Sequence, residues 1–347
     1  MRILVTGAGG FLGGAITRRL VERGDTVVAL QRKRYDALER LGVEQIQADL
    51  TDAEAVVRAV QGCDAVMHCA AKAGVWGEWG EYYNVNVLGT QNVLNACIKA
   101  HVPRLVYTST PSVTFAGQDQ EGVDETTPIP RDFLSFYAKS KAQAEREVLL
   151  ANMREGFNTV ALRPHLIWGP GDPHLIPRLI QRARAGKLRL VRAPDKRIDA
   201  CYIDNAADAH ILALDELGRE NSACAGNAYF IANGEPMPMV QLVNGILKAA
   251  GVDPVKKFMP AWLAWQLGRF FEFYYGMVER EEEPPITRFV ARQLGASHWF
   301  DLTAARRDLE YTPKIKTEQG LELLRESFEA ERKKVLEAYR RQENAAR

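Results

Sequence analysis

Long apolar runs and net charge are both missing from this sequence. No apolar stretch reaches the ~18 residues that a membrane-spanning helix needs. The 45 Lys and Arg residues balance 44 Asp and Glu residues, which leaves a net charge of +1. So small a charge creates no overall field that would recruit nucleic acid or an anionic membrane. We therefore expect neither a transmembrane span nor a nucleic-acid partner.

Cysteine is scarce as well. The chain has 5 cysteines, an odd number, and no two of them stand at a metal-ligand spacing. The 6 histidines do not cluster either, so we expect no metal site. An apolar run already begins at Ile3, which leaves no room for a signal peptide. These features indicate a protein of the reducing cytoplasm.

Short apolar strands and helices alternate through the first half of the chain. Strands are expected at residues 3–5, 26–30, 45–49, 65–69, 104–108 and 159–162. Helices are expected from Ala15 onward and over residues 52–60, 84–100 and 136–153. This rhythm predicts an α/β fold with a doubly wound parallel sheet.

Glycines stand where the first strand meets the first helix. The sequence TGAGGFLGG places Gly7, Gly10 and Gly13 three residues apart at this junction. A turn without side chains lets a diphosphate approach the backbone, and the amides at the helix start favour its charge. The spacing resembles the TGxxGxxG loop of the extended short-chain dehydrogenase/reductase family. We therefore expect a Rossmann fold that binds a dinucleotide.

The end of the second strand carries no acid. An NAD-specific site usually places Asp or Glu there to bind the ribose, whereas this chain has Gln31 followed by Arg32, Lys33 and Arg34. An acid would repel a 2′-phosphate, and the guanidinium of Arg32 would bind one. The other explanation is a solvated basic loop. We expect NADPH as the cofactor, with Asp49 near the adenine.

Beyond Pro164 the alternation breaks down. Later segments predict helices over residues 175–185, 205–217 and 239–250, short strands at 188–192 and 229–232, and a charged helix from about 317 to 342. We expect residues 1–165 and 198–230 to form the NADP-binding domain. Residues 166–197 and 231–347 should form a smaller, mostly helical substrate lobe over the carboxyl ends of the strands.

A tyrosine and a lysine stand four residues apart in the helix expected at 136–153. Tyr137 and Lys141 match the YxxxK spacing of the same family and share one helix face. An ammonium near a phenol lowers the phenol pKa from ~10 toward neutrality, which makes it a usable general acid. In the family motif SSxxV the second hydroxyl is catalytic. That hydroxyl is Thr110 here, with Ser109 and Ser112 as rivals.

The resemblance covers nearly the whole chain and fits best the 3β-hydroxysteroid dehydrogenase-like branch of this family. It rests on YTST at 107–110, YAKSK at 137–141, LRP with GPGD at 162–172, and EPPITRFV at 283–290. The resemblance implies that Asn86 supports a proton relay. The implied cofactor contacts are Gly7, Gly9, Gly10, Phe11, Leu12, Gly13, Arg32, Asp49, Leu50, Ala70, Tyr137, Lys141 and Pro164. The candidate substrate contacts are Lys72, Trp76, Ser112, His165 and Arg192.

Within this branch, KAGVWGEW and NGEPMPM resemble segments of the reductases that act in bacterial long-chain olefin synthesis. The resemblance implies reduction by NADPH of the ketone in a long-chain 2-alkyl-3-oxoalkanoic acid. Tyr137 would protonate the oxygen, Lys141 would tune Tyr137 and hold the ribose, and Thr110 would orient the carbonyl. Two alternatives stand beside this one: a sterol or 3β-hydroxysteroid dehydrogenase, and a non-catalytic dinucleotide sensor. A sensor has no need of both Tyr137 and Lys141.

One aromatic segment stands out near the C-terminus. Residues 259–277 hold two Trp and five Phe or Tyr, which predicts an amphipathic helix over the substrate entrance. The segment either packs a core or meets a membrane surface or a partner enzyme. Its leucines would line a channel for alkyl chains, and Lys72, Arg192 or Arg197 would bind the substrate carboxylate. We further expect a homodimer and an assembly with other enzymes of the olefin pathway.

Overall fold

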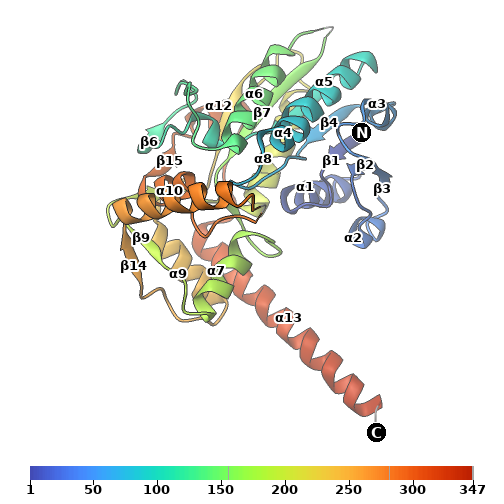
Figure 1. The fold of residues 1–347 in the computed structure, drawn as a ribbon. Helices are drawn as coiled ribbons and strands as arrows, with labels where there is room; N and C mark the ends of the chain where they lie inside the picture. Colours follow the sequence, from blue (N-terminus) through green and yellow to red (C-terminus); the bar gives the residue numbers. More distant parts are fainter. Residues whose placement is uncertain (155, 281, 346–347) are drawn as a thin grey trace.

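The computed structural model describes residues 1–154, 156–280 and 282–345. Seven parallel strands form one sheet in the order β12–β7–β5–β4–β1–β2–β3 (Figure 1). Their bounds are β1 Arg2–Thr6, β2 Thr26–Gln31, β3 Glu44–Gln47, β4 Ala65–His68, β5 Arg104–Thr108, β7 Asn158–Pro164 and β12 Ala228–Ile231. The predicted doubly wound sheet is confirmed. The strand order reverses between β1 and β4, which is the place where such sheets bind ligands.

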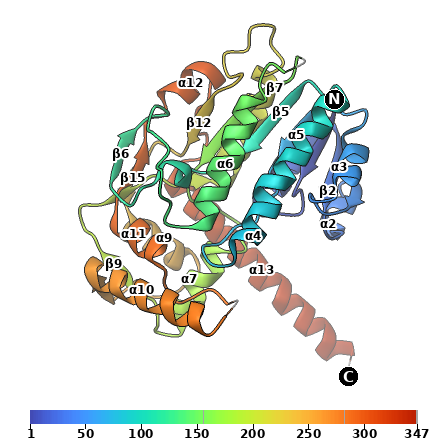
Figure 2. The same cartoon turned by 45° about the horizontal axis from the view of Figure 1, so that its top comes forward.

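Side-chain alternation along the strands builds a core on each face of this sheet. Ile3 and Val5 of β1 belong to one apolar cluster and Leu4 to another, because successive strand residues point to opposite faces. Burial on both faces explains why the strands are continuous apolar runs. Helices α1 Phe11–Glu22 and α8 Ile203–Glu216 cover the first face. Helices α3 Ala53–Val60, α5 Gly89–Lys99 and α6 Phe136–Leu150 cover the second face (Figure 2).

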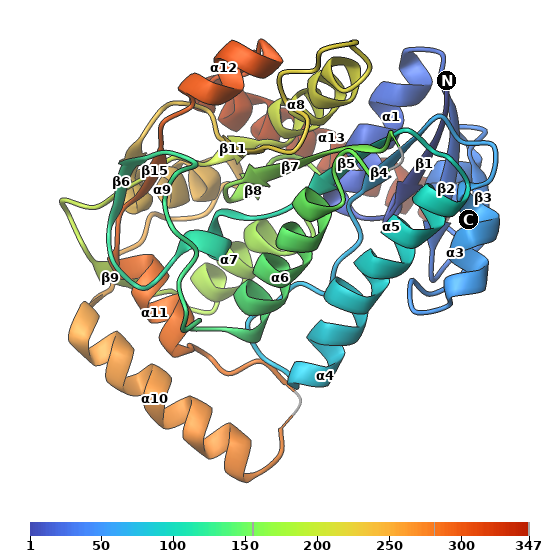
Figure 3. The same ribbon diagram turned by 90° about the horizontal axis from the view of Figure 1, so that it is seen from above.

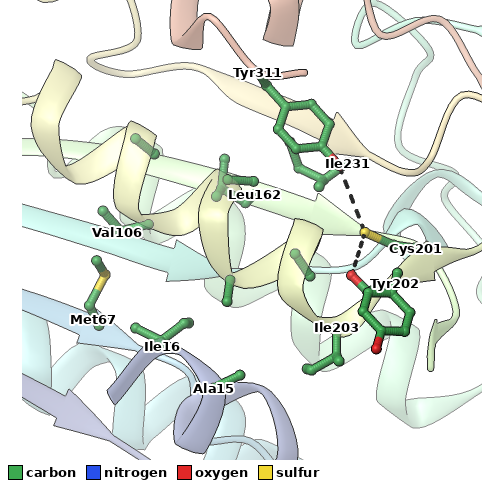
Figure 4. Packing of buried hydrophobic residues seen from close by; sticks show 14 of the residues in the cluster. Ala15, Ile16, Met67, Val106, Leu162, Cys201, Tyr202, Ile203, Ile231 and Tyr311 are labelled. Atoms are coloured by element: carbon green, nitrogen blue, oxygen red, sulfur yellow. Dashed lines mark hydrogen bonds between the residues drawn. The ribbon is translucent and has the colours of Figure 1, made fainter. Parts of the chain in front are cut away.

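The first apolar cluster continues past the sheet into the second half of the chain. Met67 and Leu162 of the central strands share it with Cys201 of the short strand β11 Cys201–Tyr202 (Figure 4). The Cys201 sulfur lies 3.9 Å from the hydroxyl of Tyr311. That hydroxyl donates to the carbonyl of Ala232 at 2.9 Å, next to β12. The sheet and the later segments are therefore packed around one common core.

The C-terminal part contains the predicted helices and more short strands than the two predicted at 188–192 and 229–232. Its helices are α7 Leu175–Arg184, α9 Met239–Ala249, α10 Ala261–Met277, α11 Arg288–Gly295, α12 Thr303–Leu309 and α13 Thr317–Ala345. Its strands are β8 Ile167–Trp168, β9 Leu190–Arg192, β10 Arg197–Ile198, β13 Met237–Pro238, β14 Phe258–Pro260 and β15 His298–Phe300. Strand β6, Gln120–Val123, lies early in the sequence and pairs with β15. The proposed domain boundaries remain a prediction.

Two helices extend from this body. The start of α13 packs against α9, and the rest of α13 projects away from the molecule (Figure 1). Helix α10 runs along the edge of the molecule with α11 beside it (Figure 3). In the described ranges, no helix combines the length and the apolar character needed to cross a bilayer.

Candidate active site

The glycine turn between β1 and α1 is a backbone cradle. A Cβ atom on Gly13 would lie 2.2 Å from the carbonyl oxygen of Gly7, so α1 packs directly on the turn. Gly7 itself has a φ of +71°, a conformation that L side chains rarely adopt. Helix α1 starts after Gly10 without a side-chain cap. The first amides of α1, from Phe11 and Leu12 onward, are therefore left for an anion, which fits the diphosphate of a dinucleotide.

Arg32 and Asp49 lie near each other, after the ends of strands β2 and β3. The pKa of Asp49 is lowered, chiefly by the Thr51 amide that donates to its carboxylate at 2.9 Å, and also by the nearby charge of Arg32. Arg32 is exposed. Gln31 before it is buried, and its side-chain oxygen accepts the Gly9 amide at 2.7 Å. No carboxylate therefore occupies the position that would repel a 2′-phosphate.

Lys141 lies in α6 and points toward the end of β5. Its ammonium donates to the carbonyl of Thr108 at 2.7 Å and lies 4.1 Å from the ring centre of Tyr107. Burial lowers the pKa of Lys141 to about 7, against the opposing charge of Glu145 one turn further along α6. Lys141 is thus a buried cation that titrates near neutral pH.

The pKa of Tyr137 shifts in the direction opposite to the one that the sequence predicts. Burial raises the pKa of Tyr137, and a hydrogen bond with the hydroxyl of Thr110 partly opposes that effect. The sequence predicts that Lys141 lowers the pKa of Tyr137. This lowering is not seen, because the lysine ammonium is held at the Thr108 carbonyl. At neutral pH the Tyr137 phenol therefore keeps its proton.

Thr110 caps the 3-10 turn Pro111–Thr114 that follows β5. Its hydroxyl accepts the Ser112 amide at 3.2 Å and donates to the Ser112 hydroxyl at 3.3 Å. The rival Ser109 has a buried hydroxyl that finds no hydrogen-bond partner among the described residues. Of the three hydroxyls, Thr110 is the one that the structure sets beside the Tyr137 phenol.

Asn86 joins the loop after β4 to α6. The expected helix 84–100 consists of a π-helical stretch Tyr83–Leu88 followed by α5, and the short helix α4 Trp79–Tyr82 precedes it. The Asn86 side chain accepts the amide of Lys72 at 2.7 Å and donates to its carbonyl at 3.1 Å. It also donates to the Ser140 hydroxyl at 2.9 Å. Asn86 therefore positions the backbone on both sides of the site, and its role in a proton relay remains a prediction.

His68 at the end of β4 is a neutral link between three elements. Its Nδ1 lies 2.7 Å from the hydroxyl of Thr6, and its Nε2 lies 2.9 Å from that of Thr90. Thr6 also accepts the amide of Ala70, and Thr90 donates to the carbonyl of Asn86. These partners assign the ring proton to Nε2. Burial lowers the pKa of His68 to about 3, so the ring is uncharged and holds Ala70 against the glycine turn.

A cavity of about 860 Å³ opens at the start of α6, where it is lined by Ser135 and Phe136, the two residues before Tyr137. Lys72 and Trp76, two of the predicted substrate contacts, line it. The Lys72 ammonium lies 3.3 Å from the carboxylate of Glu81, and the Trp76 indole donates to the carbonyl of Arg280 at 2.9 Å. Arg280 lines the same cavity, and its guanidinium lies over the ring of Tyr275. The sequence reasoning missed Arg280, because 204 residues separate it from Trp76.

The other predicted substrate contacts lie elsewhere. His165 is buried behind Pro164, its Nδ1 lies 2.8 Å from the Asp199 carbonyl, and burial lowers its pKa to about 4. Arg192 is exposed on β9 and lines a separate cavity of about 430 Å³ with Leu190 and Phe258. The structure therefore gathers Lys72 and Trp76 at the cavity by the start of α6 and places Arg192 at a different cavity.

Comparison with known proteins gives close and consistent relatives. A sequence model of the 3-beta hydroxysteroid dehydrogenase/isomerase family matches residues 4–261. A 2-alkyl-3-oxoalkanoate reductase from Shewanella oneidensis is 50% identical over 330 residues, which are 93% of this chain and 85% of the relative. One from Stenotrophomonas maltophilia is 50% identical over 332 residues, covering 95% and 100%. The UDP-glucose 4-epimerase of Thermus thermophilus, solved with NAD, superposes with a TM-score of 0.72 at 27% identity, covering 95% and 99%.

A parallel sheet of this order, matched along its length by an NAD-bound enzyme, is the fold of the extended short-chain dehydrogenases/reductases, and the family model and the two reductase relatives identify the chain as an oxidoreductase. A nicotinamide dinucleotide is the cofactor that this likeness supports. The chain belongs to the 3-beta hydroxysteroid dehydrogenase/isomerase family, whose sequence model spans most of its length.

Proposed function

We propose that this chain reduces the ketone of a long-chain 2-alkyl-3-oxoalkanoic acid to the 2-alkyl-3-hydroxy acid with NADPH, as a step of olefin synthesis. The observation that carries the proposal is the Thr110 hydroxyl beside the Tyr137 phenol, at the start of the helix whose first residue, Phe136, lines the 860 Å³ cavity. Two relatives named for this reaction share half of their residues with the chain over nearly its full length.

The roles of the residues follow from this geometry. When bound, the dinucleotide supplies the hydride. The hydroxyls of Thr110 and Tyr137 hold the carbonyl oxygen, and Tyr137 donates its proton to that oxygen as charge develops. The raised pKa of Tyr137 keeps the phenol protonated for this donation. The Lys141 ammonium, held at the Thr108 carbonyl, fixes α6 against the end of β5 and so positions Tyr137 relative to Thr110.

NADPH is the proposed dinucleotide because of the charges at the end of β2. Gln31 is neutral and already bound to the Gly9 amide, so it offers no carboxylate to a ribose 2′-hydroxyl. Arg32 is exposed and close enough to Asp49 to lower its pKa, which places a guanidinium at the adenosine end of the site. A 2′-phosphate at this place would gain charge-assisted hydrogen bonds.

Arg280 is the proposed partner of the substrate carboxylate. It lines the cavity at the start of α6, whereas Lys72 in that cavity already pairs with Glu81. A buried carboxylate without a cation or several donors would be costly. The alkyl chains would then lie along the apolar part of the cavity wall, which includes Val75 and Leu134.

The test is a substrate panel with purified protein and NADPH. We expect kcat/KM to rise with alkyl length in 2-alkyl-3-oxo acids, because each buried methylene contributes ~0.8 kcal/mol until the cavity is full. We also expect kcat/KM to fall when the acid is esterified, and Arg280→Ala to lower activity on the acid but not on the ester. A 3-ketosteroid that outperforms every such acid would replace the proposal.

A 3β-hydroxysteroid dehydrogenase is the second candidate, since the matching family model carries that description. Its substrate is a rigid ring system without a carboxylate at the reacting position. The same panel therefore separates the two candidates, because a steroid enzyme would be indifferent to Arg280→Ala.

We also propose that the enzyme works in the cytoplasm and touches a membrane surface through α10. Trp262, Phe270, Phe273 and Met277 on this helix are 59–71% exposed, so these side chains do not pack a core. Arg269 is exposed beside them, and Glu272 accepts the backbone amide of Arg288. Exposed aromatic side chains next to a cation suit a lipid interface. The homodimer and the assembly with other olefin-pathway enzymes remain predictions.

A further inference from the structure

Tyr35 lies directly on the glycine turn. A Cβ atom built on Gly9 would lie 2.2 Å from the ring of Tyr35, so the ring occupies the space that any side chain at position 9 would need. Gly9 does not have a positive φ, unlike Gly7. The backbone at position 9 would therefore accept alanine, and only the Tyr35 ring opposes it.

A pair of glutamines holds Tyr35 in this place. The Gln31 side chain accepts the Gly9 amide at 2.7 Å and donates to Gln45 Oε1 at 2.8 Å. Gln45 Oε1 also accepts the Tyr35 amide at 2.8 Å, and Gln45 Nε2 donates to the Tyr35 carbonyl at 3.2 Å. The glycine turn, the end of β2, β3 and the segment after Arg32–Arg34 are thus joined by side-chain amides.

This chain of hydrogen bonds requires an amide at position 31. A carboxylate there would accept the Gly9 amide but could not donate to Gln45 Oε1. Two acceptor oxygens would then face each other, and turning the Gln45 amide over to relieve this would break both of its bonds to Tyr35. Gln31 therefore does more than leave out a carboxylate, because its amide also holds Tyr35 in place.

We propose that Tyr35 is a cofactor-positioning residue whose ring forms the contact surface for the adenosine half of the dinucleotide. The ring lies between the turn that receives the diphosphate and the strand end that receives the ribose. It is 40% exposed, so one side packs on Gly9 while the other stays open to a ligand. An aromatic ring in this position can stack on a base or a sugar. The inference rests on the dinucleotide site of the proposed function.

Direct titration of the protein with NADPH and with NADH tests this role. Tyr35→Ala is expected to raise the Kd of both dinucleotides by a similar factor, roughly five- to 150-fold, the range of base–aromatic stacking. Tyr35→Phe should bind nearly as the wild type does, because the ring remains. Arg32→Ala is the matched control next to it and should weaken NADPH alone.

The variant Gly9→Ala is a second, independent test of the packing of the Tyr35 ring on the glycine turn. The added methyl should displace the exposed ring and weaken both dinucleotides while the thermal midpoint stays close to that of the wild type. In the Tyr35→Ala variant, Gly9→Ala should not weaken dinucleotide binding any further, since the ring is already absent.

Unchanged or tighter dinucleotide binding by Tyr35→Ala would overturn the inference, as would additive losses in the Gly9→Ala/Tyr35→Ala pair. An enzyme that prefers NADH or ignores the keto acids would sink the proposed function but leave this result intact, because both dinucleotides are titrated without turnover.

Discussion

The ammonium of Lys141 donates a 2.7 Å hydrogen bond to the backbone carbonyl of Thr108. This contact ties α6 to the end of β5, two residues before Thr110. The helix that holds the proposed proton donor, Tyr137, and the strand that presents the proposed carbonyl-binding hydroxyl are therefore fixed to each other by one buried cation. Replacing that lysine would disturb both groups at once.

Tyr137→Phe should remove nearly all turnover and leave dinucleotide affinity close to that of the wild type. The substitution removes only the hydroxyl, and general acid catalysis is worth typically ~10²–10⁴-fold. Steady-state kinetics and a direct NADPH titration check the two parts. Retention of most of the activity would mean that another group donates the proton.

The rate of ketone reduction should fall as the pH rises through the pKa of Lys141, which is about 7. Below that pH the charged ammonium makes a strong hydrogen bond to the Thr108 carbonyl, which fixes Tyr137 relative to Thr110; above it the charge is lost and this contact weakens. A kcat profile against pH measures the effect. Lys141→Arg keeps the charge and should move the fall to higher pH, and a profile that stays flat across the neutral range would argue against this role.

Arg32→Ala should lower kcat/KM for NADPH roughly 10- to 150-fold, the value of a charge-assisted hydrogen bond, and leave NADH nearly unchanged. The reason is that NADPH alone carries the 2′-phosphate. The ratio of kcat/KM for the two cofactors, in wild type and variant, is the measurement. A wild-type preference for NADH, or an unchanged ratio in the variant, would refute the assignment.

Glu145→Gln should destabilise the protein by about 3–5 kcal/mol. Glu145 receives two hydrogen bonds from Arg163, at 2.9 and 2.6 Å, and both side chains are at least 95% buried. Removing the carboxylate charge leaves the guanidinium buried without its counter-charge. Urea unfolding gives the free energy.

The control for this pair is Arg178→Ala, which breaks the exposed ion pair with Glu283. It should change the free energy of unfolding by about 1 kcal/mol or less. Equal losses in both variants would show that burial is not what makes the Glu145–Arg163 pair important.

Phe273→Ser on α10 should weaken co-sedimentation of the protein with anionic lipid vesicles and leave the thermal midpoint unchanged. Phe273 is 71% exposed, so its loss removes lipid contact and no core packing. Tyr339→Ser is the matched control, because Tyr339 is 61% exposed on the far-projecting α13. Binding that needs another olefin-pathway enzyme instead of lipid would assign α10 to a protein partner.

The parts of the site that the sequence predicted are those with a local cause. The glycine turn follows from neighbouring residues, since Gly13 must pack against Gly7 six positions earlier. The strands of the sheet are apolar runs because both faces are buried. Tyr137 and Lys141 share a helix face because residues four apart in an α-helix always do.

The remaining features depend on residues that are far apart in the chain, and only the tertiary structure decided them. The Thr108 carbonyl, 33 residues before Lys141, captures the ammonium that spacing alone assigned to Tyr137. Arg280 reaches the cavity through a contact with Trp76 across 204 residues. Hydrophobic periodicity specifies which face of a helix or strand is buried. It does not specify which polar group from a distant part of the chain contacts that helix or strand. The sequence alone thus determined the fold class and the place of the chemistry, while the packing of the whole chain set the protonation of the groups and the walls of the cavity.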